Sequence, residues 1–564
     1  MGGFGVNSRK ENNSSDIKFK KFIKEAIKYQ SKGNLSKAKS IYISIVKKGC
    51  TNLLVLNNLA SILRRESNYD KALELLNKAI ELYPNNSDSY SIRALIYMSL
   101  NKLDSASSSI DKAIEIKSDD FTYSYNKAII LNRKGDFDQA EKLFTFVLKR
   151  NPNYTPAISD LALLHVDTGD LDKAEIGMRK AIELSPMNSK YHSNLASILN
   201  HKGELELAGE KALEAIKINP FSFKAYFILS NLKKHQNNEY FLHHLFSKEL
   251  ANRAVGRQKI DLAYARSNVL HRNSKYSDSA FYLKSANDQK LAYFPTDLHQ
   301  YIRVGNKIFN LTTNLSPTKE NLNTEYIFIV GMPRSGSTLT ESIISMKSNI
   351  FDLGETQILE EALISLNLNN NLDQIYKLSS LYDQKRREVL NCSHSNSIVT
   401  TDKQLYNYSY VPFIASQFPT AKIIHCYRNP LDNILSIYRA HFAKGSQYAS
   451  CLKSSANLYI YQDQLMEKYK TVFPKNIFSL DYDQLVANPE DVITKLVGWL
   501  KWDWDDIYLR PHLNSRSVAT ASNVQVRSPI NNKSVGGWLK YKDLLTPALN
   551  ELSKIQKFAY LMDL

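Results

Sequence analysis

The feature that most constrains the fold of this 564-residue chain is a repeat with a period of 34 residues. Two series of alanines follow this step without a gap. The first series consists of Ala26, Ala60, Ala94, Ala128, Ala162 and Ala196, and the second of Ala38, Ala72, Ala106, Ala140, Ala174 and Ala208. Self-similarity at a fixed period of this size indicates stacked copies of one structural unit. The N-terminal part of the chain is therefore expected to be a linear array of repeats.

Each repeat has the properties of a helical hairpin. Its two alanines lie twelve residues apart, at the point where two antiparallel helices cross closely and only a methyl group fits. Glycines such as Gly33 and Gly135 end the first helix, and prolines such as Pro84 and Pro152 end the second. This pattern resembles the tetratricopeptide repeat, in six copies with a degenerate seventh. The resemblance implies an all-α solenoid whose groove binds a peptide or partner protein, or an array that only braces its neighbour.

The extent of the repeat and a change in composition at Tyr326 predict four parts: a flexible N-terminal tail (residues 1–16), the repeat solenoid (17–235), a helical linker (236–323) and a second domain (324–564). Within the linker, Ile260–Arg272 and Ser277–Ala292 predict a further degenerate hairpin. The polar stretch Thr312–Asn323 marks the boundary before the second domain.

The second domain opens with a pattern that is typical of an anion-binding loop. Tyr326–Val330 is a short apolar run, as expected of a buried parallel strand, and it leads into Gly331–Thr338 (Gly-Met-Pro-Arg-Ser-Gly-Ser-Thr) and a helical pattern. A strand, a glycine-bearing loop and a helix N-terminus together bind anions through backbone N–H groups. The loop has Arg334 but lacks the lysine of nucleotidase loops, and we expect no apolar strand that ends in an aspartate to hold Mg²⁺. We therefore expect a bound phosphate that is not itself transferred, and no metal.

A second anion signature follows another apolar strand. Arg428 comes directly after Lys422–Tyr427, and Ser436 lies eight residues further, on the next predicted helix. An arginine and a hydroxyl suit a terminal phosphate monoester. Together with Pro333–Leu339, this motif resembles the sulfotransferases, whose donor is 3′-phosphoadenylyl sulfate. The resemblance extends from Tyr326 to the C-terminus and implies an α/β domain with a P-loop-like parallel sheet.

The same resemblance implies the residues that bind the donor. The loop residues expected at its 5′-phosphosulfate are Arg334, Ser335, Gly336, Ser337 and Thr338, and those expected at its 3′-phosphate are Arg428 and Ser436. Tyr482 resembles a tyrosine near the nucleotide, and Ser522, Gln525, Pro529, Asn531 and Trp538 resemble the closing segment of tyrosylprotein sulfotransferases. Two departures are Ser337, where threonine is usual, and Gly537, where a lysine is expected; Lys533 or Lys540 would have to replace that lysine.

Sulfuryl transfer requires a base for the acceptor hydroxyl and positive groups for the transition state. By its position after the loop helix, Glu355 resembles the catalytic glutamate of the family, with Asp352 as the alternative base. Lys403 and Ser522 are expected to stabilise the developing charge, with Thr520 as an alternative to Ser522. Because Arg334, Lys403 and Arg428 each follow a predicted strand, they should meet at one edge of a parallel sheet.

Charge and cysteine spacing limit the partners and the compartment. The formal net charge is +17, and both the first 50 residues and the C-terminal half are basic, which suits anionic ligands. The chain shows no nucleic-acid-binding motif, so nucleic acid is not expected as a partner. The four cysteines form no CxxC pair, which favours a reducing, cytoplasmic location. No apolar run reaches 18 residues, so we expect no membrane-spanning helix.

Taken together, the sequence predicts a sulfotransferase that moves a sulfuryl group to a hydroxyl of a protein, a glycan or another acceptor, while the solenoid binds that acceptor or a partner. The alternative function is a tetratricopeptide-repeat scaffold with a degenerate sulfotransferase domain. A nucleoside-triphosphate-dependent kinase is disfavoured by the missing lysine in the loop.

Overall fold

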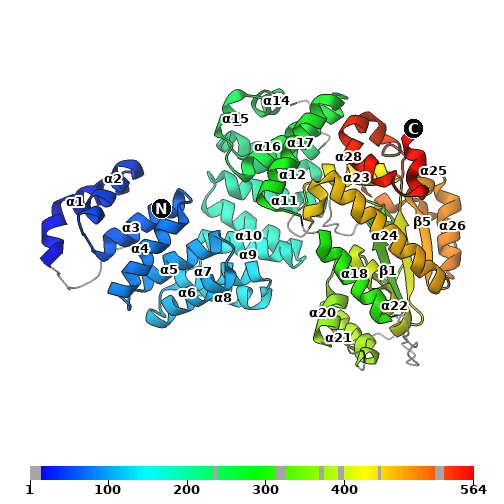
Figure 1. Cartoon of the computed structure of the whole chain (residues 1–564), viewed down its shortest axis with the longest axis horizontal. Helices are drawn as coiled ribbons and strands as arrows, with labels where there is room; N and C mark the ends of the chain where they lie inside the picture. Colours follow the sequence, from blue (N-terminus) through cyan, green and yellow to red (C-terminus); the bar gives the residue numbers. More distant parts are fainter. Residues whose placement is uncertain are drawn as a thin grey trace. The chain divides into compact units, whose positions relative to one another are not determined.

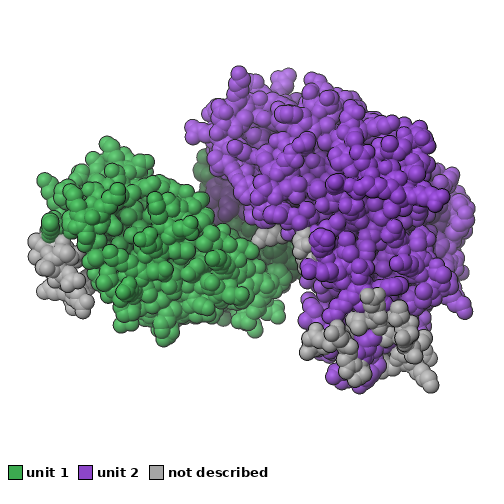
Figure 2. Space-filling model, viewed as in Figure 1, with its two compact units in different colours: residues 1–187 green, residues 188–564 purple. Residues whose placement is uncertain are grey.

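The computed structural model describes residues 14–232, 238–296, 298–312, 325–366, 372, 374–390, 399–442, 446–514 and 526–564. The chain divides into two compact units, residues 1–187 and residues 188–564 (Figure 2). The division falls inside the repeat array, so the last of the predicted repeats belong to the same unit as the second domain. No helix in the described ranges is long and apolar enough to cross a membrane.

The first unit is built from successive helical hairpins (Figure 1). Its helices are α1 (Ser14–Ser31), α2 (Leu35–Lys47), α3 (Leu53–Arg65), α4 (Tyr69–Leu82), α5 (Ser87–Ser99), α6 (Leu103–Ile116), α7 (Phe121–Lys134), α8 (Phe137–Arg150), α9 (Thr155–Asp167) and α10 (Leu171–Leu184). Every alanine of the two 34-residue series is at most 1% exposed, including Ala196 and Ala208 in the second unit. The alanines therefore occupy the tight crossings that the period predicted.

The turns inside the hairpins follow the same period. Gly33, Gly135 and Gly169 adopt positive φ values of 77 to 86°, the left-handed conformation that glycine adopts at low cost. In the two repeats that lack this glycine, Ser67 and Asn101 take the same place, with φ values of 60° and 59°. The turn geometry is therefore kept even where a side chain makes it costly.

The second unit begins with helices that continue the repeat array and its linker. They are α11 (Ser189–Lys202), α12 (Leu205–Ile218), α13 (Phe223–Asn231), α14 (Glu239–Leu245), α15 (Lys248–Arg253), α16 (Arg257–Arg272), α17 (Tyr276–Tyr293) and α18 (Leu298–Thr312). Helices α16 and α17 form a hairpin in which Ser267 and Ser279, twelve residues apart, replace the alanine pair. Their buried hydroxyl oxygens lie 2.9 Å apart, and Ser274 takes the left-handed turn position.

A five-stranded sheet forms the centre of the C-terminal domain. The strands are β1 (Tyr326–Gly331), β2 (Ile350–Asp352), β3 (Val399–Asp402), β4 (Lys422–Tyr427) and β5 (Ile477–Asp481), in the order β2-β3-β1-β4-β5 with every neighbouring pair parallel. The predicted fold class, a helical repeat region followed by an α/β parallel-sheet domain, is confirmed. Because the chain passes from β3 to β4, on opposite sides of β1, the sheet has its topological switch point at β1.

Side chains of β1 alternate between two apolar layers. Tyr326, Phe328 and Val330 pack with residues of α21 (Leu378–Leu390), α22 (Val411–Gln417) and α24 (Leu452–Val472). Ile327 and Ile329 pack on the other face with residues of α19 (Ser337–Ile344) and α26 (Pro489–Trp499). With both faces covered, polar groups concentrate where the strands end.

The remaining elements of the domain surround these layers. They are α20 (Ile358–Ser365), η1 (Ile375–Lys377), η2 (Leu405–Tyr410), α23 (Pro430–Arg439), η3 (Gln447–Ser450), α25 (Tyr482–Ala487), η4 (Asp506–Leu509), η5 (Pro511–Leu513), η6 (Gly537–Tyr541), α28 (Lys542–Leu552) and η7 (Gln556–Met562).

Candidate functional site

The loop between β1 and α19 is shaped by two glycines and one strained arginine. Gly331 has a φ of 144°, and a Cβ atom there would overlap the backbone carbonyl of Cys426 in β4. Gly336, the N-cap of α19, has a φ of 96°, and a Cβ atom there would overlap the ring of Tyr482. Arg334 between them has a φ of 68°. The sequence folds into this tight loop because side chains are absent where neighbouring segments approach closely.

Helix α23 holds the loop in place. Asn433 Nδ2 donates to the carbonyl of Pro333 at 3.0 Å, and Arg334 Nε donates to Ser436 Oγ at 3.0 Å. Residues of the two predicted anion signatures, far apart in the sequence, therefore meet through a direct hydrogen bond. Asn433 was not identified from the sequence, because nothing in its local pattern distinguishes it from an ordinary helical residue.

The site contains two arginines and buried hydroxyl groups, with carboxylates on one side, since Arg428 lies 3.8 Å from Asp432 and 4.0 Å from Asp483. Burial, together with the nearby charge of Arg428, lowers the pKa of Arg334 to about 10. The Oγ atom of Ser335 is buried and has no hydrogen-bond partner among the described residues. Arg334, the unpartnered hydroxyl of Ser335 and the N-terminus of α19 belong to one loop, and an anion bound there would satisfy all three.

Arg428 lies at the end of β4, 5% exposed, in a dense set of contacts. Its Nη2 atom donates to the carbonyl of Ser534 at 2.8 Å and lies 3.8 Å from Asp432 Oδ2. Its guanidinium covers the ring of Tyr482 at 4.6 Å, and the Tyr482 hydroxyl lies 2.9 Å from Ser534 Oγ. Tyr482 is thus placed against the proposed phosphate-binding arginine, and Ser534 is a further residue of this site that the sequence did not reveal.

At the other side of β1, Lys403 follows β3 and is 1% exposed. Its Nζ atom donates to Glu355 Oε1 at 2.9 Å and lies 3.7 Å from Glu341 Oε2. The Glu355 side chain is 47% exposed, whereas Glu341 is buried in α19. Glu355 therefore combines access to solvent with a buried cationic neighbour. Glu341 was missed because only the tertiary fold brings it to Lys403.

Asp352, the alternative base, is used structurally. Its Oδ1 atom accepts hydrogen bonds from the hydroxyl groups of Ser345 and Thr401, the latter at 2.9 Å. These bonds connect β2 to β3 and to the end of α19, and they favour Glu355 over Asp352 as the residue available to an acceptor.

The sequence led us to expect no apolar strand that ends in an aspartate able to hold Mg²⁺. The strand ends differ from that expectation, since β3 ends at Asp402 and β5 at Asp481. Both carboxylates are occupied: Asp402 accepts from Tyr382 at 2.9 Å and from the backbone of Gln404, and Asp481 caps α25. Burial raises the pKa of Asp402 to about 6. Among the described residues, no group of three or more His, Cys, Asp or Glu side chains could hold a metal ion.

The structure places most of the sequence-predicted residues at the carboxyl edge of the sheet. Ser337 and Thr338 are buried in the first turn of α19. Ser522 and Gln525, and also Thr520, lie outside the described residues. Lys540 points elsewhere, because its Nζ lies 5.0 Å from the ring centroid of Tyr276 in α17.

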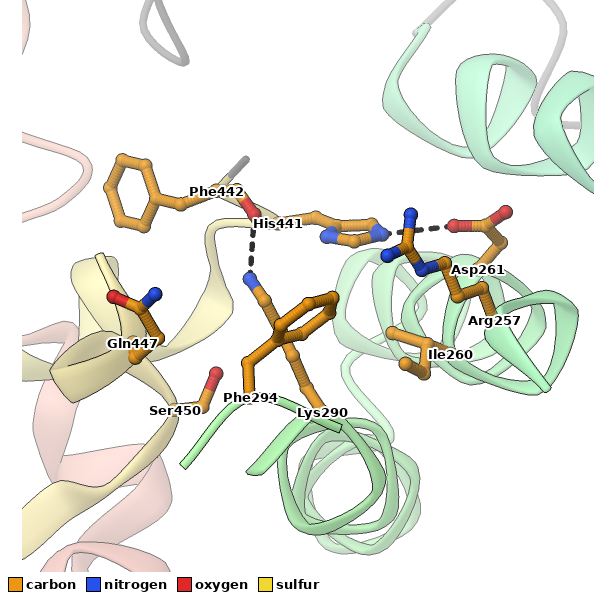
Figure 3. A pocket seen from close by; sticks show the side chains of 9 residues that line it. All are labelled: Arg257, Ile260, Asp261, Lys290, Phe294, His441, Phe442, Gln447 and Ser450. Carbon is orange, nitrogen blue, oxygen red and sulfur yellow. Dashed lines mark hydrogen bonds and ion pairs between the residues drawn. The ribbon is translucent and has the colours of Figure 1, made fainter. Parts of the chain in front are cut away.

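A separate pocket lies in the second unit, between the α16–α17 hairpin and the segment that follows α23 (Figure 3). It is lined by Arg257, Ile260, Asp261, Lys290, Phe294, His441, Phe442, Gln447 and Ser450. Lys290 Nζ donates to the carbonyl of Phe442 at 2.6 Å, and burial lowers the pKa of Lys290 to about 8. None of the sequence-predicted site residues lines this pocket.

Comparison with known proteins adds independent findings. Residues 326–506 match the sulfotransferase family, and residues 54–86, 87–120 and 131–208 match tetratricopeptide repeats. An uncharacterized protein of Aquifex aeolicus is 32% identical over 252 residues, which cover 40% of this chain and 32% of that protein. Protein-tyrosine sulfotransferase A of Caenorhabditis elegans is 25% identical over 253 residues, covering 41% and 65%.

A solved structure, that of the type IV pilus biogenesis factor PilW, is 20% identical with a TM-score of 0.35, and it covers 39% of this chain and all of that one. The chain thus spans about a third of the length of the Aquifex protein and about two thirds of the Caenorhabditis enzyme.

Proposed function

Because the chain carries N-terminal tetratricopeptide repeats and a C-terminal sulfotransferase family domain, with distant similarity to protein-tyrosine sulfotransferases, we propose that it is a sulfotransferase that uses 3′-phosphoadenylyl sulfate. The observation that carries this proposal is a pair of arginines at the switch point of the sheet: the partly buried Arg334, which donates a hydrogen bond to Ser436, and the buried Arg428. Such a site has the charge for two separate anionic groups and needs no metal to balance them.

The residues present fit the donor. The N-terminus of α19, Arg334 and the unpartnered Ser335 hydroxyl would hold the 5′-phosphosulfate, and Ser337 and Thr338 in the first helical turn would add hydroxyl donors. Arg428 and Ser436 would hold the 3′-phosphate, with Tyr482 beside them. When bound, the donor would supply a sulfuryl group attached to a good leaving group. The protein would then need only to position the two reactants and to balance the negative charge of the transition state.

In the proposed reaction Glu355 accepts the proton of the acceptor hydroxyl. The oxygen of that hydroxyl forms a bond to sulfur, and the bond from sulfur to the nucleotide phosphate oxygen breaks. Lys403, buried next to Glu355, keeps the carboxylate oriented and places a positive charge near the reacting groups. In this proposal Ser522 helps to stabilise the developing charge, and Gln525 contacts the donor.

The acceptor in this proposal is a hydroxyl on a protein or peptide, or on a glycan or other molecule, presented by the repeats. The match to protein-tyrosine sulfotransferases favours a protein tyrosine, and the tetratricopeptide repeats favour a peptide partner. A cytoplasmic location is also part of the proposal. It rests on the spacing of the four cysteines, which form no CxxC pair and suit a reducing compartment.

A transfer experiment tests the proposed activity. The full chain is incubated with ³⁵S-labelled 3′-phosphoadenylyl sulfate and fractionated cell extract, and label in acceptors is measured next to a Lys403→Met variant as control. The proposal predicts incorporation by the unmodified chain and almost none by the variant. Tight nucleotide binding without any transfer would instead favour the alternative function, a repeat scaffold with a degenerate domain.

The role of the repeats needs its own test. Removing residues 1–187, the first compact unit, should leave donor affinity intact and lower kcat/KM for the natural acceptor, since remote contacts supply positioning. An unchanged kcat/KM would show that these repeats do not present the acceptor.

A further inference from the structure

The C-terminal segment that reaches the nucleotide site is attached to a turn of the repeat array. Arg527 Nη2 donates to the backbone carbonyl of Lys202 at 3.0 Å, across 325 residues of sequence. Lys202 is the last residue of α11, the first helix of the sixth repeat, and both residues belong to the second compact unit. The carbonyl groups at a helix C-terminus lack intrahelical partners and carry the negative end of the helix dipole, so a guanidinium is well placed there.

The glycine that follows α11 is adapted to this contact. Gly203 has a φ of 87°, like its counterparts in other repeats, but only here would a Cβ atom overlap the guanidinium of Arg527. At Gly135 and Gly169, which have φ values of 86° and 85°, a Cβ atom would meet nothing within 4 Å. The left-handed backbone conformation is therefore shared by these three repeats. Only at Gly203 is a side chain also excluded by a neighbouring residue.

The same C-terminal segment ends in the donor site. Seven residues after Arg527, the carbonyl of Ser534 accepts from Arg428 and its hydroxyl lies against that of Tyr482. The N–H groups of Gly536 and Trp538 then donate to Asp432 of α23 at 2.7 and 2.9 Å. The segment is thus fixed at one end on the repeat turn and at the other on the proposed 3′-phosphate arginine.

We propose that the sixth repeat is a positioning element of the nucleotide site, acting through Arg527. The repeat holds Arg527 at the C-terminus of α11 and thereby fixes the path of the backbone over residues 527–538. That path determines where Ser534 contacts Arg428 and Tyr482. Arg527 is a positioning residue, since it acts through Ser534 and Arg428. This inference rests on the proposed function for its consequence in donor binding, but the coupling itself is a property of the free protein.

The test compares Gly203→Ala with Gly169→Ala in the full chain. Both variants carry the same backbone strain, so both should lower the melting temperature, but only Gly203→Ala displaces Arg527. Calorimetric titration with 3′-phosphoadenosine 5′-phosphate should show affinity weakened about tenfold in Gly203→Ala and in Arg527→Ala. In both variants Arg428 loses the placement that Ser534 gives it, and with it the charge-assisted contact proposed for the 3′-phosphate. Gly169→Ala should show no change. Equal affinities of the two glycine variants would overturn the inference.

Hydrogen exchange of the free protein gives a second readout that does not depend on any ligand. The amides of Gly536 and Trp538, which are bonded to Asp432, should exchange faster in Gly203→Ala than in Gly169→Ala. Unchanged exchange in Gly203→Ala would refute the coupling. If the unmodified chain failed to bind the nucleotide, the proposed function would be refuted. The exchange result would still decide whether the turn after α11 is coupled to residues 527–538.

Discussion

Replacing Glu355 by glutamine separates chemistry from binding at one residue. Glutamine keeps the size and the hydrogen-bonding reach of the side chain but removes the basic oxygen next to Lys403. Lys403 remains paired with a carboxylate, because Glu341 Oε2 lies 3.7 Å from its Nζ. Since the Glu355 side chain is 47% exposed, loss of the ion pair should cost only about 1 kcal/mol or less of stability.

The expected kinetic effect is far larger than the effect on stability. If Glu355 accepts the acceptor proton, kcat should fall by about 10²–10⁴ while donor affinity stays nearly constant. Asp352→Asn is the matched control, because that carboxylate bonds to Ser345 and Thr401 instead. The assay is steady-state transfer from labelled donor, combined with calorimetric titration of the nucleotide product.

The pH dependence of the Glu355→Gln variant also reports on the acceptor. A phenol ionises near pH ~10, so raising the pH should partly restore transfer to a tyrosine, whereas a sugar hydroxyl should show no rescue. A near-normal kcat for Glu355→Gln, with a large loss in Asp352→Asn, would refute the assignment of the base and transfer it to Asp352.

Two further predictions follow from strain and burial. Ser67→Gly should raise the free energy of unfolding by about 0.5–1 kcal/mol, because Ser67 occupies a left-handed turn. Chemical denaturation measures this change, with Ser108→Gly in the interior of α6 as a control that should lower the free energy of unfolding. Burial lowers the pKa of Lys290 to about 8 from 10.5, so the unfolded chain binds more protons between these values and stability rises with pH there. Lys290→Met should reduce this rise of the free energy of unfolding with pH, which denaturation curves between pH 8 and 10.5 measure. The same pH dependence in the variant and in the unmodified chain would contradict the burial argument.

The repeats could be predicted closely because their determinants are local and recur. Two alanines twelve residues apart determine where the helices of each hairpin cross. Because the pair recurs in six repeats, the pattern predicts the array far better than one hairpin would. The sequence did not reveal that Ser67 and Asn101 adopt the glycine conformation. That outcome follows from packing of the neighbouring helices, which imposes the turn on whatever residue stands there.

The candidate site was predictable where a motif follows a strand directly. Arg334, Lys403 and Arg428 each follow a strand at the carboxyl edge of the sheet, because β3 and β4 run parallel to β1. Residues that depend on tertiary contacts were missed: Glu341 reaches Lys403 only through the fold, and Arg527 bonds to a repeat turn 325 residues away. Their local sequence carries no signal of these contacts.

Binding of 3′-phosphoadenosine 5′-phosphate, compared with ATP and without magnesium, tests the central claim most directly. Calorimetric titration of the full chain should show much tighter binding of the 3′-phosphorylated nucleotide, since Arg428 and Ser436 are proposed to recognise a group that ATP lacks. Arg428→Ala should weaken that binding at least ~10-fold, because a charged hydrogen bond contributes about 1.5–3 kcal/mol, and should leave any ATP binding unchanged. Equal affinities for the two nucleotides, or a requirement for magnesium, would contradict the account.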